Sequence, residues 1–200
     1  MKINLVFAAA LSGWLAAAAA AAAWAPTATA QRLLVTGSAW SQVTPSTDGA
    51  ELIEAAIDIH APARTVWMVM NDCGRMKRMV SSTMLCRTVE GDPRQGWDVR
   101  EQITKGNFFV PTLRNLVRND YQPFSLIRFH RVGGDLRIEE GEWRLEARDG
   151  GATTRVIYTN RVAIDILAPA ALVRAGMRRD TAKVLVNLRR ESVAAAHGGV

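Results

Sequence analysis

IDIHAPARTVW, residues 57–67, marks the place where a strand gives way to a helix. Upstream and into this stretch, Ile53, Ala55, Ile57 and Ile59 alternate with more polar neighbours, which is the period of a half-buried strand. The Pro that follows suits the first turn of a helix. Apolar residues at positions 66, 67, 69 and 70 give that helix a buried stripe. The stretch therefore predicts a strand that leads directly into a short amphipathic helix.

Beyond this helix the chain is dominated by strand patterns separated by turn residues. The clearest hairpin turns at Asp149-Gly150-Gly151, between two long alternating runs. A second short helix around residues 75–80 is also compatible with the pattern. The expected strands after the first are residues 84–89, 97–103, 112–117, 125–132, 136–147 and 153–166.

The C-terminal segment is helical. Val173, Met177, Thr181, Val184 and Leu188 recur at spacings of three and four, and arginines occupy much of the remaining surface. Antiparallel strands with one apolar face need a cover across that face. The predicted fold class is α+β: a curved antiparallel sheet of about six to seven strands wrapped around this long helix, with a hollow between them.

The first thirty residues have the composition of a secretory signal peptide. Lys2 is followed by an apolar run and then by Ala28-Thr29-Ala30, the small-x-small pattern that signal peptidase cuts. We expect cleavage after Ala30 and export, to the periplasm if the source is Gram-negative; an uncleaved membrane anchor is the alternative. The predicted organisation is a signal peptide at 1–30, a linker or N-terminal arm at 31–50, and one ligand-binding domain at 51–195.

The charge balance does not indicate a nucleic-acid partner. The 200 residues carry 25 Lys and Arg against 19 Asp and Glu, a formal charge of +6. One of those positive charges, Lys2, belongs to the predicted signal peptide. The remaining excess is modest for a chain of this length, and much of it falls on the C-terminal helix.

The two cysteines, Cys73 and Cys86, lie thirteen positions apart. An even number of cysteines in an exported protein predicts a disulfide. Two buried free thiols are the alternative. A metal site is disfavoured because no His or second Cys pair stands at ligand spacing.

Three groups of residues carry a resemblance to a known family. Ile57-x-Ile59-x-Ala61-Pro62-x-x-x-Val66-Trp67 resembles the opening of the START-like (SRPBCC) superfamily, which includes polyketide cyclase, coenzyme Q-binding and lipid-transfer proteins. The segments 133–145 and 154–158 look like the hairpin of the same group, and the last helix matches its lid helix. The resemblance implies a helix-grip fold whose cavity binds a hydrophobic small molecule or lipid. It does not imply one reaction.

No catalytic motif stands out in the sequence. There is no nucleophile elbow, phosphate loop or metal-binding pair of histidines, so the sequence implies no cofactor and no metal. Glu101 and His130 are the acid–base candidates, because a carboxylate among apolar neighbours would have a raised pKa. For Glu101 a salt bridge to an arginine on a neighbouring strand is the alternative, and for His130 a structural role.

The predicted ligand-lining residues are mostly aromatic. We expect the cavity to be lined by Trp67, Trp97, Glu101, Phe108, Phe129, Trp143, Tyr158 and Met177. The pair Phe108-Phe109 stands in a loop pattern between strands. It would touch a membrane, guard the cavity mouth or plug the core beneath the loop. The arginine-rich face of the last helix offers a further peripheral membrane contact, or is a solvated helix face.

These features favour an exported binding or carrier protein for a hydrophobic small molecule or lipid. A cyclase or hydrolase that uses acid–base residues in the same cavity is the alternative. An interaction module with a filled cavity is a third reading.

Overall fold

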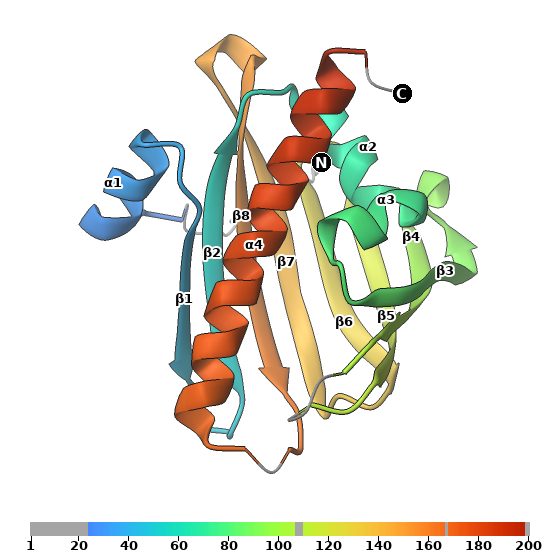
Figure 1. Ribbon diagram of the computed structural model, residues 1–200. Helices are drawn as coiled ribbons and strands as arrows, with labels where there is room; N and C mark the ends of the chain where they lie inside the picture. The colour runs from blue at the N-terminus through green and yellow to red at the C-terminus, as the bar shows by residue number, and fades with distance from the viewer. Residues whose placement is uncertain (1–23, 107–109, 167, 199–200) are drawn as a thin grey trace, which may run out of the picture.

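The computed structural model describes residues 24–106, 110–166 and 168–198. One antiparallel sheet of eight strands runs in the order β1-β2-β8-β7-β6-β5-β4-β3 (Figure 1). The strands are β1 (Trp40–Pro45), β2 (Glu51–Ile59), β3 (Thr83–Asp92), β4 (Trp97–Thr104), β5 (Leu113–Gln122), β6 (Leu126–Gly134), β7 (Ile138–Arg148) and β8 (Thr153–Ala163). The helices are α1 (Ala28–Val35), α2 (Ala63–Asn71), α3 (Cys73–Met79) and α4 (Ala170–Ala196), with single turns η1 (Pro93–Gln95) and η2 (Asp149–Gly151).

The α+β helix-grip class predicted from the sequence is confirmed, with one strand more than the six to seven expected. The additional strand is β1, which pairs with β2 from Trp40↔Ala56 to Pro45↔Glu51. It falls inside residues 31–50, where the sequence predicted a linker or arm, and α1 ends in the same segment. The sequence does not reveal this strand, because six residues rich in Ser, Thr and Gln carry too little alternation.

The strand-to-helix stretch that opened the sequence analysis folds as predicted. Pro62 is the N-cap residue of α2, and Val66 and Val69 are buried on the side of the helix that faces the sheet. The Thr154 hydroxyl on β8 donates a hydrogen bond of 2.7 Å to the Ala61 carbonyl. This bond fixes the point at which the chain leaves the sheet and turns over it.

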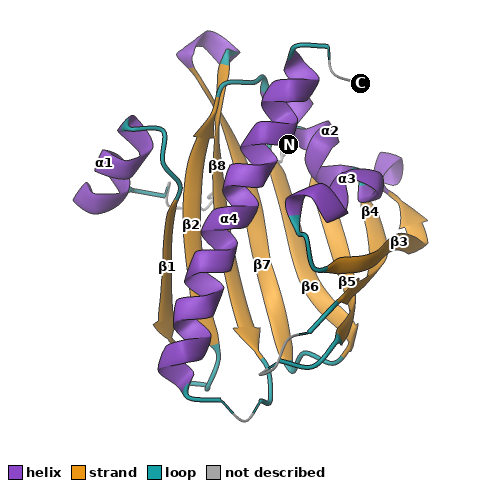
Figure 2. Cartoon of the chain, in the orientation of Figure 1, coloured by secondary structure: helices purple, strands orange, loops and turns teal. Residues whose placement is uncertain are grey.

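Helices α2, α3 and α4 all lie against one side of the sheet, which we call the inner face (Figure 2). Alternate residues of β2 and β8, including Ile57, Ile59 and Val156, form a fully buried core with Leu185 and Leu188 of α4. Because side chains alternate along each strand, this core assigns every regular strand position to one of the two faces. The assignment decides which predicted residues can meet a ligand beneath α4.

The opposite side, the outer face, is covered in part by α1. Ala30 and Leu34 pack there against Trp40, Ala56 and Ile157, and all five residues are buried. The Trp24 ring lies 5.9 Å from that of Trp40. Apolar packing therefore continues onto the outer face over β1, β2 and β8.

Candidate functional site

Three aromatic side chains gather on the inner face at the centre of the sheet. The rings of Trp143 on β7 and Tyr158 on β8 are stacked with centroids 4.0 Å apart, and the Phe129 ring lies 6.1 Å from Tyr158. Gly141 stands directly opposite Phe129 in the ladder. A Cβ there would collide with the Thr159 carbonyl and the Phe129 ring, so glycine is what lets the phenyl group lie flat on the sheet.

Two of these three aromatic residues remain partly accessible to solvent. Trp143 and Tyr158 are each half-buried even though α4 and α2 lie on the same face. The fully buried core instead runs along β2 and the end of α4. A partly accessible aromatic surface between sheet and helix is suited to stack against an apolar molecule.

Polar groups adjoin this aromatic surface near the N-terminal end of β7. Glu139 has the same strand parity as Gly141 and Trp143, and its Oε2 is buried with no hydrogen-bond partner. Asn160 on β8 donates a hydrogen bond of 2.9 Å from Nδ2 to the Tyr158 hydroxyl, while its own Oδ1 is buried and unpaired. Unpaired buried polar atoms are rare in native proteins and call for a physical explanation.

The electrostatics of this group follow from its burial. Desolvation raises the pKa of Glu139 to about 7, against the opposing attraction of Arg131. Desolvation also raises the pKa of the Tyr158 phenol, and the nearby charge of Glu139 adds to that effect. The phenol therefore keeps its proton at neutral pH, and Glu139 titrates close to neutrality.

Two other predicted site residues also lie on the inner face. Met177 of α4 packs beside Ile53, Leu136 and Val162, a second apolar cluster that Tyr158 also contacts. Trp67 of α2 is edge-on to Tyr121, with ring centroids 5.7 Å apart. The structure thus brings Phe129, Trp143, Tyr158, Met177 and Trp67 to the same side of the sheet.

Trp97 and Glu101 do not belong to this group, and the prediction that they line the cavity is wrong. On β4 the residues that face α2 are Asp98 and Arg100, because Arg100 donates a hydrogen bond of 3.2 Å to the Oδ1 of Asn71. Trp97 and Glu101 therefore point to the outer face. There the Arg118 guanidinium lies over the Trp97 ring at 4.4 Å from its centroid.

Glu101 also has the opposite electrostatic character from a buried general acid. Hydrogen bonds of 2.6 Å from Arg114 and Arg87 hold its pKa below the ordinary value. The raised pKa expected from its apolar neighbours is thus wrong, and the alternative, a salt bridge to a neighbouring strand, is what the structure contains. Two arginines hold this carboxylate in its ionised form, so it is a poor proton donor.

His130 lies on the outer face as well. Together with Arg128, Glu140, Glu142 and Arg161 it lines a shallow depression of about 600 Å³. This places the second predicted acid–base residue on the side of the sheet opposite the stacked aromatic residues. Phe108 and its loop neighbour lie outside the described residues.

Residues 59–189 match the sequence profile of a family described as polyketide cyclase / dehydrase and lipid transport. The chain belongs to this family. No protein of curated function matches it in sequence. Membership of a polyketide cyclase and lipid-transport family agrees with the fold and with the resemblance carried by the strand-to-helix stretch.

Solved structures share the fold at low sequence identity. The chain is similar to the ZhuI aromatase/cyclase of Streptomyces sp. R1128, with a TM-score of 0.63, 19% identity, and coverage of 76% of this chain and 99% of that one. It is also similar to human StAR-related lipid transfer protein 5, with a TM-score of 0.62, 11% identity, and coverage of 79% and 83%. A STAR-related lipid transfer protein from Xanthomonas axonopodis is similar with a TM-score of 0.60 and 12% identity, and the match covers 76% of this chain and 98% of that one.

Two further observations concern the described parts of this family member. No three His, Cys, Asp or Glu side chains come together as a metal site. No helix is long and apolar enough to cross a membrane. Both statements refer to residues 24–106, 110–166 and 168–198.

Sequence reasoning missed Glu139 and Asn160 as site residues. The signal that would have found Glu139 is parity: it lies two and four residues before Gly141 and Trp143, so it shares their face. Asn160 shares the face of Tyr158 by the same rule. The adjacent acidic residues Glu140 and Glu142 have the opposite parity and lie on the outer face.

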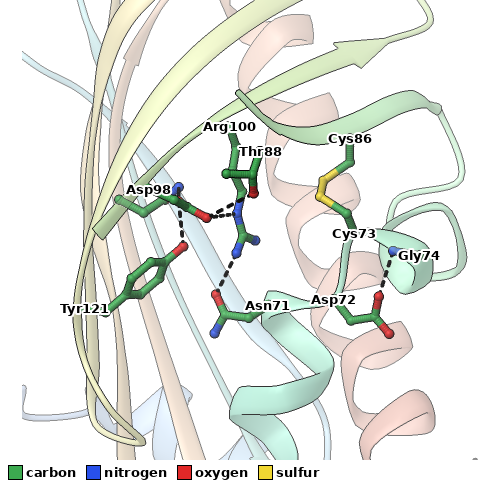
Figure 3. Close-up of a disulfide and its surroundings, with 10 residues drawn as sticks. Asn71, Asp72, Cys73, Gly74, Cys86, Thr88, Asp98, Arg100 and Tyr121 are labelled. Carbon is green, nitrogen blue, oxygen red and sulfur yellow. Dashed lines mark hydrogen bonds and ion pairs between the residues drawn. A yellow bond between two sulfur atoms is a disulfide. The ribbon is translucent and has the colours of Figure 1, made fainter. Parts of the chain in front are cut away.

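A second buried polar cluster joins α2 to β3, β4 and β5 (Figure 3). Asp98 is fully buried and accepts hydrogen bonds of 2.8 Å from Arg100, Asn119 and Tyr121. The predicted disulfide between Cys73 and Cys86 is confirmed, and it joins α3 to β3 beside this cluster. Because both carboxylate oxygens of Asp98 are paired, the cluster is suited to holding strands together.

The raised pKa of Glu139 predicts a pH-dependent stability. The folded state binds the Glu139 proton more tightly than the unfolded state between the ordinary pKa of 4.5 and about 7, so stability falls as pH rises through this window. Since the side chain is partly accessible, we expect the effect to be about 1–2 kcal/mol. Glu139→Gln should remove it.

Urea denaturation at pH 5.0 and pH 8.5 measures this effect as the change in the free energy of unfolding between the two pH values. Glu140→Gln, on the outer face, is the matched control and should keep the wild-type dependence. An equal pH dependence in wild type and Glu139→Gln would show that Glu139 titrates normally.

Proposed function

We propose that the chain is an exported binding or carrier protein for a hydrophobic small molecule held against the inner face. The observation that carries the proposal is the stacked group of Phe129, Trp143 and Tyr158, of which Trp143 and Tyr158 are half-buried between sheet and helix. The family description and the aromatase/cyclase and lipid-transfer structures of the same fold support it. A lipid is the ligand class that the family description favours.

An aromatase/cyclase-type enzyme is the second candidate. The observation in its favour is Glu139, a carboxyl that desolvation brings to a pKa of about 7 beside the Tyr158 phenol. Such a group can donate or accept a proton at neutral pH. Glu101 and His130 no longer support this candidate, because both lie on the outer face.

Replacing Trp143 tests where the ligand binds. We expect Trp143→Leu to weaken the binding of 2-methylnaphthalene, an uncharged apolar probe, by about tenfold, since stacking on the indole is lost while the apolar character stays. Trp97→Leu, which changes the same residue type on the outer face, should leave the affinity unchanged. The affinities are measured by isothermal titration calorimetry.

Failure of the wild-type protein to bind the probe would contradict the binding function. Equal losses in the two variants would contradict the inner-face location. Native mass spectrometry of the protein recovered from its exported compartment supplies the companion test, since a carrier should co-purify with an apolar molecule and persistently empty protein would argue against it.

Export with cleavage after Ala30 belongs to the same proposal. In the folded chain Ala28 and Ala30 lie in the first turn of α1, and Ala30 is buried. A peptidase needs an accessible segment, so cleavage at this bond has to precede the docking of α1. Intact mass of the exported protein tests the site: a chain that begins at Gln31 is expected, and a chain that retains Trp24 would refute it.

The proposal also includes a peripheral membrane contact. Leu172, Arg179, Lys183, Val186 and Arg190 form an exposed stripe along α4 that mixes apolar and basic side chains. Such stripes bind anionic lipid surfaces. Co-sedimentation with phosphatidylglycerol vesicles that survives Arg179→Glu/Lys183→Glu would remove this stripe from the proposal.

A further inference from the structure

The hydrogen-bonding groups at the edge of the aromatic surface have unused capacity. Glu139 Oε2 and Asn160 Oδ1 are buried without a partner, and Asn160 itself is only 5% exposed. The Tyr158 hydroxyl accepts a hydrogen bond from Asn160 and keeps its own proton to donate. An unpaired polar atom of this kind costs about 1–3 kcal/mol, so the two unpaired oxygens of Glu139 and Asn160 on one apolar face are costly unless a ligand completes them.

The three groups are neighbours on the sheet. Glu139 pairs with Val162, and Asn160, two residues earlier on β8, pairs with Gly141. All have the inner-face parity of Trp143, and the influence of Glu139 on the Tyr158 phenol places their polar ends within electrostatic reach of each other. The polar groups therefore adjoin the stacked aromatic residues in one continuous surface.

The local charge balance selects the kind of polar group that fits. Arg131, the cation that acts on Glu139, is exposed and already donates a hydrogen bond of 2.8 Å to the Gly134 carbonyl, so it is poorly placed to neutralise a buried ligand anion. A carboxylate ligand would meet the carboxyl of Glu139 directly. A ligand hydroxyl, by contrast, can accept a hydrogen bond from the Tyr158 hydroxyl and donate one to Glu139 or Asn160.

We propose that the ligand is an apolar molecule bearing a hydroxyl group, and that Glu139, Asn160 and Tyr158 bind this hydroxyl while the aromatic residues hold the apolar body. This inference rests on the proposed binding function and narrows it. It separates ring alcohols and phenols from plain hydrocarbon chains and from fatty-acid anions.

Two probes of similar shape test the inference. 2-Naphthol carries one hydroxyl, and 2-methylnaphthalene carries a methyl group at the same place. We expect the wild-type protein at pH 6 to bind 2-naphthol about tenfold more tightly, by the net value of its hydrogen bonds. Glu139→Leu should abolish this preference while keeping or improving the affinity for 2-methylnaphthalene, which also shows that the variant is folded.

Two further variants complete the design. Tyr158→Phe keeps the ring that stacks on Trp143 and should also reduce the preference for 2-naphthol. This second variant tests the inference even if Glu139→Leu fails to fold. Glu140→Leu changes the adjacent outer-face residue and should leave the preference unchanged. All affinities are measured by isothermal titration calorimetry.

The outcomes separate the inference from the function on which it rests. Loss of the preference in Glu139→Leu and Tyr158→Phe supports the inference. Binding of both probes with a preference that neither variant alters overturns the inference and leaves the binding function standing. Failure of both probes to bind the wild-type protein overturns the binding function.

Discussion

Asp98→Ala is expected to destabilise the protein by about 3–5 kcal/mol, because it leaves the Arg100 guanidinium buried without its counterion. Arg100 is 5% exposed, and its Nε donates a hydrogen bond of 2.8 Å to the Asp98 carboxylate. Asp98 also accepts hydrogen bonds from Asn119 and Tyr121 on β5. One substitution therefore leaves an unpaired charge and two unpaired hydrogen-bond donors, at the junction of three strands with α2.

The matched control is the exposed ion pair on the adjacent strand. Arg118 and Asp120 lie 3.0 Å apart with side chains 36% and 47% exposed. Asp120→Ala should cost less than about 1 kcal/mol, since water solvates both charges when the pair is broken. Urea denaturation gives both values. Comparable losses of unfolding free energy in Asp98→Ala and Asp120→Ala would show that burial does not make the Asp98 ion pair more important for stability than an exposed one.

A double substitution identifies the cause of the loss. Asp98→Leu/Arg100→Met removes both charges and replaces them with apolar groups of similar length. It should recover part of the stability that Asp98→Ala loses, because the buried uncompensated charge is gone. A double variant less stable than Asp98→Ala would mean that the hydrogen bonds to β5, and not the charge on Arg100, dominate.

The fold could be predicted from the sequence because its local patterns agree with its packing. The run from Ile53 to Ile59 alternates, Pro62 begins a helix, and the spacing from Val173 to Leu188 gives one helical face. In the structure these residues form β2, α2 and the side of α4 that meets the sheet. Where pattern and burial coincide, element type and order follow from the residues alone.

The site could be predicted only in part, because β4 inverts the usual relation between polarity and face. Its apolar residues Trp97 and Val99 point outward, where Arg118 of β5 lies over the Trp97 ring, and its charged residues Asp98 and Arg100 are buried inside. Alternation reveals two faces but not which one is buried. On β7 and β8 the aromatic residues do lie inside, so there the reasoning chose the correct face.

Removal of the Cys73–Cys86 disulfide is the second change expected to have a large effect. The bond closes a loop with a sequence separation of 13 that contains α3 and the first residues of β3. Opening a loop of this size increases the entropy of the unfolded chain and should lower the free energy of unfolding by about 3 kcal/mol. The Cα atoms are 5.3 Å apart, within the range that disulfides ordinarily span.

The place of the bond makes a local effect expected as well. β3 is the last strand of the sheet and pairs only with β4, so the disulfide to α3 on the inner face gives this edge strand a second attachment. In Cys73→Ser/Cys86→Ser, amide hydrogens of β3 should exchange faster than those of β8, which has a partner strand on either side. Addition of dithiothreitol should reduce the stability of the wild type to that of the variant and leave the variant unchanged. A loss below about 0.5 kcal/mol, with β3 exchange unaltered, would mean that contacts of α3 with α4 and β3 hold this edge without the covalent bond.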